Sequence, residues 1–388
     1  MVFFKPSIFY YDHKTALKLA YYNCVKHFSI PRFLFTIVFL VVHFALVLFL
    51  AFGRLIDEIF LSGYKDVIIK EPVFIISNPR CGTTFLHRLL SLDKDHYTYT
   101  LLYHTLFPCA FYIIIIRAIA KLDSKLGGFL KKLIDLADKL FFGGWKDIHP
   151  MGLYQPEEDE GIFTIAVYTP ALVLLSPWAY KLDYLKYLDL AKPKTKQRIK
   201  EYYISSLQRI VYATNPNATL LMKNVYSTGR LNFILECFPD AKIIYPLRHP
   251  YKAVPSVISM FTGPWNLHSR DIKDDSEEAR GFGQIMIDYY NYIYQQKEVI
   301  DKHNLLMLEY NQIVSHPQET AYKIYDYFGF KMSEAYKKAL KNYTTKSKSY
   351  KSKHNYSLAQ YGYTKEYIYS QLHELMDEFE LSKDIDNV

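Results

Sequence analysis

Cysteine is scarce in this sequence, and the few cysteines are not arranged to bind a metal. The 388 residues include four, none of them in a C-x-x-C pair, and no cluster of cysteine and histidine has the spacing of a zinc site. Neither a zinc module nor a disulfide framework is therefore indicated. The four are Cys24, Cys81, Cys109 and Cys237.

The sequence also lacks a recognisable nucleic-acid-binding module, although the chain is basic. Its formal net charge is +8, and its 36 tyrosines and 26 phenylalanines are spread evenly rather than clustered with arginine. We therefore expect a polyanionic partner other than nucleic acid. A small polyphosphate ligand and an anionic membrane surface account for the excess charge equally well.

Charge is missing from one long segment near the N-terminus. Residues Phe33–Phe52 are apolar apart from one histidine and a threonine, and they are numerous enough to cross a bilayer as a helix. Basic residues predominate before this run, whereas acidic residues offset them after it. We therefore predict a membrane-anchoring helix in an N-terminal segment 1–60, with a cytosolic N-terminus and the rest of the chain on the far side. The alternative is a helix that packs on the domain or lies in the membrane interface.

A second apolar stretch, Leu106–Ala120, is interrupted by Pro108 and Arg117 and is a poor candidate for a span. Residues Lys121–Phe142 continue it in a basic, amphipathic pattern. We predict an apolar helical insertion at about 101–145 that rests on a membrane or covers a hydrophobic substrate. A helix pair facing the core is the alternative.

Strand and helix patterns alternate from residue 72 onward, which predicts one α/β domain over 61–388. The expected fold is a P-loop-like, mostly parallel β-sheet flanked by helices on both faces. The predicted strands are 73–77, 219–222, 242–246 and 305–309, and the predicted helices are 83–92, 195–212, 228–237, 284–302 and 320–328.

The first strand leads into a turn and a helix that are suited to binding phosphate. Gly82 lets the backbone approach a ligand closely, and Thr83 and Thr84 open the helix. The N–H groups there have no intrahelical partner, and the helix dipole adds positive potential. A Walker A loop would place a lysine after the glycine, whereas here Arg80 precedes Gly82 by two positions. This argues against a magnesium-nucleotide kinase.

The segment ISNPRCGTTFLHRLL resembles the phosphosulfate-binding loop of PAPS-dependent sulfotransferases, in their bacterial-type and membrane-associated branches. The resemblance implies that Arg80, Cys81, Gly82, Thr83 and Thr84 hold the 5′-phosphosulfate of PAPS (3′-phosphoadenosine 5′-phosphosulfate) without a metal. Cys81 departs from the family pattern, which has serine or glycine there, so one phosphate contact would be lost or would come from the backbone.

A second segment, IIYPLRHPYKAVPS, is similar to the 3′-phosphate motif of the same family. The resemblance implies that Arg248 and Ser256 clamp the 3′-phosphate, and the fork of an arginine suits that role. It extends from about residue 72 to 370. Near its end, Tyr310 resembles the family's strand-end tyrosine, and Lys353 precedes a segment resembling the family's closing motif and is a further candidate for the 3′-phosphate.

Four consecutive acids, QPEEDE, supply candidates for a general base. Sulfuryl transfer requires a base to deprotonate the acceptor, and the resemblance extends to this segment, so we expect Glu157 or Glu158 in that role. Clustering of the acids is expected to raise the pKa of one member. A solvated start of a helix is the alternative. His149 is a second candidate base, and by resemblance Lys223 offsets charge on the transferring group.

The sequence therefore predicts an enzyme that moves a sulfuryl group from PAPS to a hydroxyl or amine and releases PAP. The apolar insertion favours a lipid-like acceptor, and a glycan is the competing acceptor. Two other hypotheses stay open. One is a phosphotransferase with an atypical P-loop, and the other is a membrane-anchored nucleotide-binding protein whose site has decayed.

Overall fold

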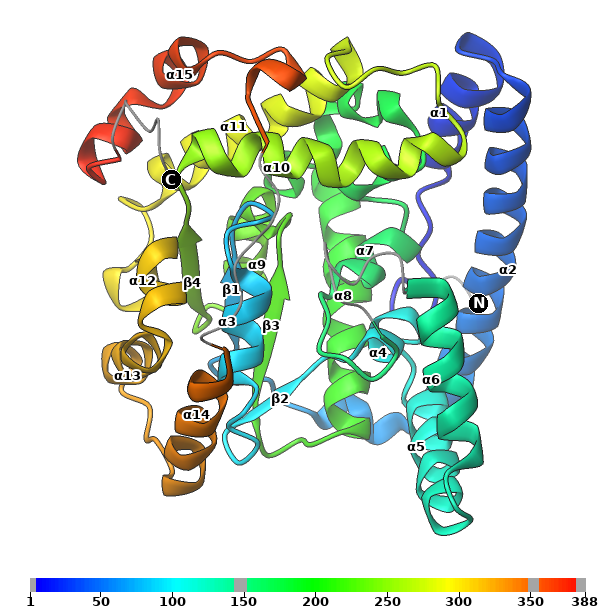
Figure 1. Cartoon of the computed structure of the whole chain (residues 1–388). Coiled ribbons are helices and arrows are strands. Elements are labelled where there is room, and N and C mark those ends of the chain that lie inside the picture. The colour runs from blue at the N-terminus through cyan, green and yellow to red at the C-terminus, as the bar shows by residue number, and fades with distance from the viewer. Residues whose placement is uncertain (1–4, 143–151, 348–355, 382–388) are drawn as a thin grey trace.

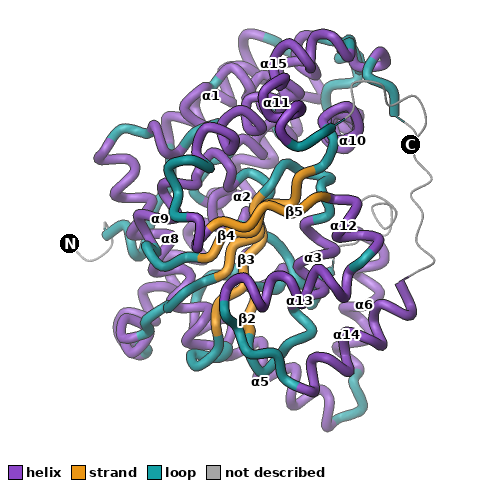
Figure 2. The backbone as a smooth tube through the Cα atoms, turned by 90° about the vertical axis from the view of Figure 1, so that its left-hand side faces the viewer, coloured by secondary structure: helices purple, strands orange, loops and turns teal. Residues whose placement is uncertain are grey.

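A parallel five-stranded β-sheet forms the centre of the computed structural model, which describes residues 5–142, 152–347 and 356–381 (Figures 1 and 2). The strand order is β2-β3-β1-β4-β5, and each neighbouring pair is parallel. The strands are β1 Val73–Ile76, β2 Tyr97–Tyr99, β3 Thr219–Asn224, β4 Lys242–Leu247 and β5 Leu305–Glu309. The α/β class and the four strands predicted from the sequence are confirmed. Strand β2 was missed because its three residues contain no apolar run.

Helices cover both faces of the sheet, and alternate residues of each strand face each side. One face packs on α8, α9, α10 and α11, and the other packs on α3, α12, α13 and α14. Figure 2 shows α3, α13 and α14 on one side of the strands and α8 and α9 on the other. Both faces of β1 are buried, so this central strand reads as a continuous apolar run. The bounds are α3 Thr83–Leu90, α8 Pro193–Ala213, α9 Leu231–Cys237, α10 Pro250–Thr262, α11 Glu277–Gln296, α12 Tyr310–Ser315, α13 Pro317–Phe328 and α14 Glu334–Ser347.

The remaining helices lie outside these two layers. The predicted insertion contains α4 Leu102–Leu106, α5 Ala110–Lys125 and α6 Phe129–Phe142. Helix α7 spans Glu160–Ile165, α15 spans Lys365–Glu378, and α1 spans His13–Tyr21. In Figure 1, α5 and α6 stand beside the long N-terminal helix α2, at the opposite side of the molecule from α12 and α13.

Helix α2, Ile30–Phe60, contains the predicted apolar helix and runs along one edge of the molecule (Figure 1). Within the described residues it is the one helix long and apolar enough to cross a bilayer. One face of α2 is buried, and its buried residues recur at helical spacing. They are Arg32, Thr36, His43, Val47, Leu50, Gly53, Arg54 and Asp57.

The C-terminal end of α2 is bonded into the core of the sheet domain. Asp57 accepts from Nε of Arg209 at 3.0 Å, and neither side chain is exposed to solvent. Asp57 also accepts from the backbone N–H groups of Ala110 and Phe111, at 3.0 and 2.7 Å, and so caps α5. The predicted segments 1–60 and 61–388 therefore share one core, and the boundary between them stays a prediction from the sequence.

Candidate functional site

The residues singled out in the sequence meet at the carboxyl edge of the sheet. The loop before α3 follows β1, Lys223 is the second-last residue of β3, Arg248 follows β4, and Tyr310 follows β5. Because all the strands are parallel, their carboxyl ends lie at the same edge, where ligands bind in open α/β sheets.

The loop between β1 and α3 has two residues in the left-handed region. Gly82, the N-cap of α3, has φ +81°, and Arg80 has φ +68°. Only glycine adopts this conformation without strain, so the surrounding structure must hold Arg80 in it. Nη1 of Arg248 donates to the carbonyl oxygen of Arg80 at 2.7 Å and supplies one such restraint. A Cβ added to Gly82 would lie 3.1 Å from the ring of Tyr310.

The two segments that resemble phosphate motifs come together at this loop. Nε of Arg80 donates to Oγ of Ser256 at 3.1 Å. Ser256 lies in the second turn of α10 and is nearly buried, and the guanidinium of Arg248 lies 4.6 Å from the centre of the Tyr310 ring. Two guanidinium groups and a hydroxyl therefore gather beside the N-terminus of α3, an arrangement suited to a phosphate-rich ligand.

Cys81 lies in the loop, but its side chain faces the protein core. The thiol is fully buried, 3.7 Å from the carbonyl oxygen of Pro79 and 3.6 Å from the hydroxyl of Tyr290. Burial raises the pKa of this thiol. The Cys81 side chain, at a position where the family pattern has serine or glycine, therefore contributes to packing behind the loop and not to the surface that a ligand would meet.

Lys223 lies at the centre of a second cluster of polar side chains beside α3. Its buried Nζ lies 3.1 Å from Oγ1 of Thr84, 3.0 Å from Oε1 of Glu158 and 3.5 Å from Oε1 of Glu157. Burial alone would lower the pKa of Lys223, but the carboxylates of Glu158 and Glu157 outweigh it and raise the pKa above its ordinary value. The lysine is therefore held as a cation against the helix that begins at the loop.

Backbone bonds fix the acidic segment against the sheet. The N–H of Glu157 donates to the carbonyl oxygen of Thr100 at 3.0 Å, and Oγ1 of Thr100 donates back to the carbonyl oxygen of Glu157 at 2.7 Å. Pro156 forms an antiparallel bridge with Leu101. The segment is thus paired with the chain that follows β2, and both glutamates lie beside Lys223.

The other two acids of the cluster turn away from Lys223 into a buried network. Oδ1 of Asp159 accepts from Nδ2 of Asn224 at 2.7 Å, and Glu160 pairs with Arg230 at 2.7 Å. Burial raises the pKa of Asp159 to about 6, and its bonds to Tyr203 and Asn224 oppose that rise. The pKa rise at Asp159 comes mainly from burial, whereas the sequence suggested clustering of the acids as the cause, and Asp159 holds the acidic segment in place.

His87 lies on α3 behind Lys223 and was not singled out in the sequence. It is fully buried, and burial together with the positive charge of Lys223 lowers its pKa to about 3. Asn224 and Arg230, which hold the acidic segment, were also missed, although both lie in the same LLMKNVYSTGRL stretch as Lys223. Two predicted residues, His149 and Lys353, lie outside the described residues.

A model of the sulfotransferase family matches residues 72–334. The omega-hydroxy-beta-dihydromenaquinone-9 sulfotransferase Stf3 of Mycobacterium bovis and that of Mycobacterium tuberculosis are each 25% identical to this chain over 311 residues, which cover 78% of this chain and 72% of the relative.

Two solved structures share the fold. The sulfotransferase STF9 of Mycobacterium avium superposes with a TM-score of 0.69 at 21% identity, covering 85% of this chain and 82% of that one. The sulfotransferase STF1 of Mycobacterium tuberculosis gives a TM-score of 0.69 at 18% identity, covering 93% of this chain and 92% of that one. Because the family model matches well over half of the chain, this protein belongs to the sulfotransferase family and is a transferase enzyme.

Proposed function

We propose that the enzyme transfers the sulfuryl group of PAPS to a hydroxyl of a lipid-like acceptor and releases PAP. The family implies PAPS as the donor. The observation that carries the site assignment is the contact between Arg80 and Ser256, at 3.1 Å, with Arg248 bonded to the backbone of Arg80. Arg80 through Thr84 would hold the 5′-phosphosulfate at the N-terminus of α3, with Cys81 contributing through its backbone. Arg248 and Ser256 would hold the 3′-phosphate.

In the proposed reaction, the oxygen of the acceptor hydroxyl bonds to sulfur while Glu158 accepts the proton of that hydroxyl. The bond from sulfur to the bridging phosphate oxygen breaks, and PAP leaves with that electron pair. Lys223 offsets the charge that develops there, so positioning and fixed positive charge supply the stabilisation and the proposal needs no metal ion. Glu158 is favoured over Glu157 because it lies nearer to Lys223 and is the more exposed of the two.

The lipid character of the acceptor is supported by the curated relatives, whose name describes a menaquinone-derived substrate. It is also supported by the exposed apolar side chains of α5 and α6, the insertion that precedes the acidic segment. A glycan is the competing acceptor class.

The test is to compare lipid extracts from cells with and without the protein after labelling with radioactive sulfate. We expect a labelled lipid that depends on the protein and is missing with Glu158→Gln. Label that appears in glycans alone would overturn the lipid acceptor. Undiminished PAPS binding in the double variant Thr83→Ala with Arg248→Ala would overturn the site itself.

We also propose that α2 associates the enzyme with a membrane. The earlier expectation of a cytosolic N-terminus, with the catalytic domain beyond the bilayer, applies to a spanning helix and stays a prediction. The packing of α2 supports a different arrangement, in which the helix lies along the membrane surface.

A further inference from the structure

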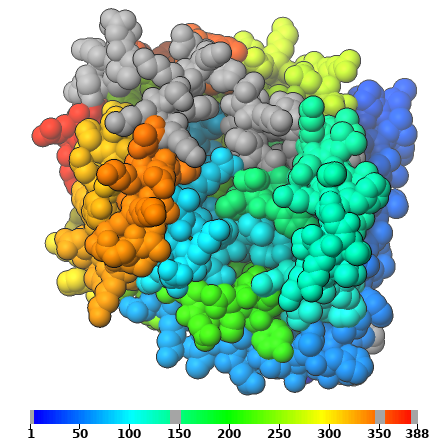
Figure 3. All heavy atoms as spheres, turned by 60° about the horizontal axis from the view of Figure 1, so that its bottom comes forward, coloured from blue at the N-terminus to red at the C-terminus, as the bar shows by residue number. Residues whose placement is uncertain are grey.

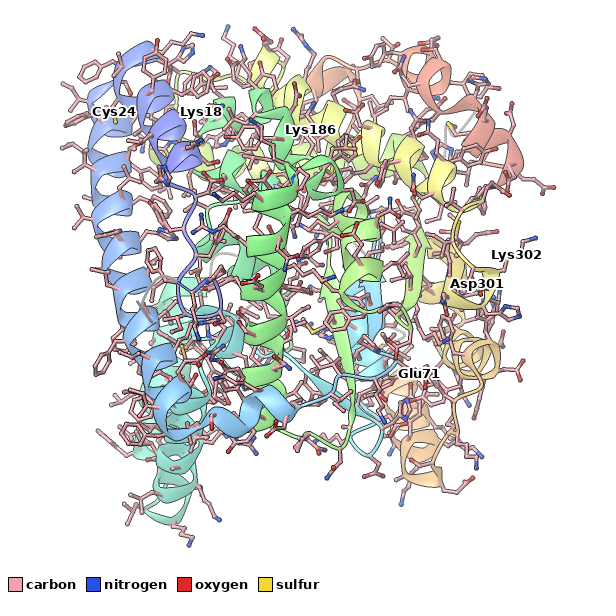
Figure 4. The ribbon with its side chains drawn as sticks, turned by 180° about the vertical axis from the view of Figure 1, so that it is seen from behind. Lys18, Cys24, Glu71, Lys186, Asp301 and Lys302 are labelled. Atoms are coloured by element: carbon pink, nitrogen blue, oxygen red, sulfur yellow. The ribbon has the colours of Figure 1, made fainter. Side chains whose placement is uncertain are left out.

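Helix α2 is bonded to the catalytic domain at both of its ends. Near the N-terminal end, Nε of the buried Arg32 donates to Oγ of Ser269 at 2.9 Å. Thr36 accepts from Nδ2 of Asn23 at 2.9 Å, and the same amide donates to the carbonyl oxygen of Leu175 in the domain at 2.9 Å. Near the C-terminal end, Nη1 of the fully buried Arg54 donates to Oγ of Ser206 at 2.8 Å. The helix therefore lies along the domain over its whole length, as Figure 4 shows from behind.

This packing is hard to reconcile with a helix that crosses a bilayer. A helix of this length extends for roughly 45 Å, at 1.5 Å per residue. If it spanned the membrane, the polar elements packed along it would enter the hydrocarbon layer with it, where unsatisfied polar groups are costly. Only 22% of its most apolar part is buried, so a wide apolar face still requires a partner.

Helix α5 extends that apolar face sideways. The ring of Tyr112 on α5 stacks on Phe49 of α2, with ring centres 4.3 Å apart, and its hydroxyl donates to the carbonyl oxygen of Phe49 at 2.8 Å. Gly53 permits this contact, because a Cβ there would lie 2.3 Å from the Tyr112 ring. Asp123, buried at the end of α5, caps α6 through the N–H groups of Leu130 and Lys131, at 2.8 and 2.9 Å.

The three helices present a surface that is apolar and fringed by positive charge. In Figures 1 and 3, α5 and α6 lie on the same side of the molecule as α2, and α5 contacts both α2 and α6. The exposed apolar residues include Val38, Val41, Val42, Leu48 and Phe52 on α2, Ile115, Ile119 and Leu122 on α5, and Phe129, Leu133, Leu136 and Leu140 on α6. Exposed lysines lie at Lys121, Lys125, Lys131, Lys132 and Lys139. Apolar side chains with basic neighbours are the pattern of a surface that binds anionic lipid.

This surface is connected to the acidic segment of the site. The N–H of Leu153 donates to Asp138 of α6 at 3.2 Å, and its carbonyl oxygen accepts from the N–H of Tyr103 at 3.2 Å. Glu158, the proposed base, follows five residues later. The last helix of the apolar surface thus contacts the chain that carries the proposed base.

We propose that α2, α5 and α6 form one lipid-binding surface that lies in a single leaflet of an anionic membrane, with α2 parallel to the membrane plane. The catalytic domain and both ends of α2 are then on the same side of the bilayer. A membrane-dissolved acceptor enters the site alongside α6. This last step rests on the proposed function, whereas the binding of lipid does not.

Binding to vesicles tests the surface. The full chain is mixed with vesicles of phosphatidylcholine, with or without phosphatidylserine, and the bound fraction is measured by sedimentation. We expect binding to require phosphatidylserine, to weaken with salt, and to fall at least tenfold (about 1.4 kcal/mol) in Val41→Asp with Leu136→Asp. The matched control is Leu190→Asp with Val299→Asp, which also removes two exposed apolar side chains. Equal loss in both double variants would overturn the proposal.

The depth of α2 distinguishes a lateral helix from a spanning one. Single labelled cysteines replace Leu34, Val42, Phe52 or Leu136 in a chain with Cys24→Ser and Cys237→Ser, and quenching by lipids labelled at different depths is recorded. A lateral helix predicts similar depth at the three α2 positions and quenching at Leu136. The deepest position at Val42, with no quenching at Leu136, would establish a spanning helix instead.

The two proposals fail separately. The aspartate variants on the lipid-binding surface should retain PAP binding, and they should retain transfer to a water-soluble acceptor while losing transfer to an acceptor embedded in vesicles. If no lipid acceptor exists, vesicle binding is still expected. If vesicle binding fails while lipid sulfation is intact, the lipid-binding surface is wrong and the enzyme function stands.

Discussion

Nε of Arg80 donates to Oγ of Ser256 at 3.1 Å, although 176 positions separate the two residues in the sequence. The contact joins the loop after β1 to the helix after β4. Neighbouring parallel strands whose carboxyl ends meet at one edge make this contact possible. It brings two segments that are proposed to bind phosphate, and that were found separately in the sequence, to one position in the fold.

Glu158→Gln should lower kcat by about 10²–10⁴, the range typical of losing a general base. Its affinity for PAP should not change, because the carboxylate is proposed to act on the acceptor. Glu157→Gln is the matched control and should have a smaller effect on kcat. Steady-state kinetics with PAP titrations provide both readouts. Equal losses of kcat in the two variants would mean that both glutamates take part in proton transfer. A larger loss in Glu157→Gln would make Glu157 the general base instead of Glu158.

Lys223→Met should destabilise the fold as well as reduce turnover. The change leaves Glu157 and Glu158 close together without their cation, and breaking a buried ion pair costs about 3–5 kcal/mol. Denaturant unfolding measures this cost. Adding Glu158→Gln to Lys223→Met should recover part of the stability and none of the activity. Additive losses of stability would mean that the two residues do not interact in solution.

Cys81→Ser should leave PAPS binding nearly unchanged, within about twofold (0.4 kcal/mol). The thiol faces the core, between the carbonyl oxygen of Pro79 and the hydroxyl of Tyr290, and so is placed away from a ligand. The KM for PAPS measures this. A tenfold gain in affinity would mean that the side chain at this position contacts the phosphosulfate.

Acid should destabilise the protein through its buried histidines. Burial, with a further contribution from Arg117, lowers the pKa of His104 to about 3, against an ordinary value of 6.5. Below pH 6.5 the histidine binds a proton in the unfolded chain but not in the folded chain. The free energy of unfolding is therefore unaffected by His104 above pH 6.5 and falls as the pH drops from 6.5 toward 3. Over that range the free energy of unfolding of the wild type should fall by about 1.4 kcal/mol per pH unit relative to that of His104→Gln. Denaturant unfolding at each pH measures this. A difference in the free energy of unfolding between the two proteins that stays constant from pH 7 to pH 4 would contradict the prediction.

The sequence was most informative where chemistry and local structure coincide. The loop around Gly82 could be predicted because a glycine and two threonines at the start of a helix suit a phosphate. Arg248 was predicted from its resemblance to the family's 3′-phosphate motif. The scaffold behind them could not be found in that way. Asn224 donates to Asp159 and Glu160, and Arg230 pairs with Glu160, through the folding of distant segments. Nothing in the local sequence separates these buried acids from solvated ones.

The long apolar helix shows a second limit. Length and composition made Phe33–Phe52 a candidate span, but the polar residues that attach α2 to the domain act through its tertiary partners. Arg54 and Asp57 read as the charged flank of a span in the sequence, whereas in the structure they are buried against Ser206 and Arg209.

The central claim is that Arg80, Arg248 and Ser256 form one site for a nucleotide with a 3′-phosphate. Isothermal titration of PAP and of AMP, which lacks that phosphate, tests it most directly. We predict that wild type binds PAP at least 100-fold more tightly than AMP (about 2.7 kcal/mol), and that Arg248→Ala with Ser256→Ala removes most of this preference while AMP binding changes little. Equal affinity of wild type for PAP and AMP, or a preference that survives in the double variant, would contradict the account.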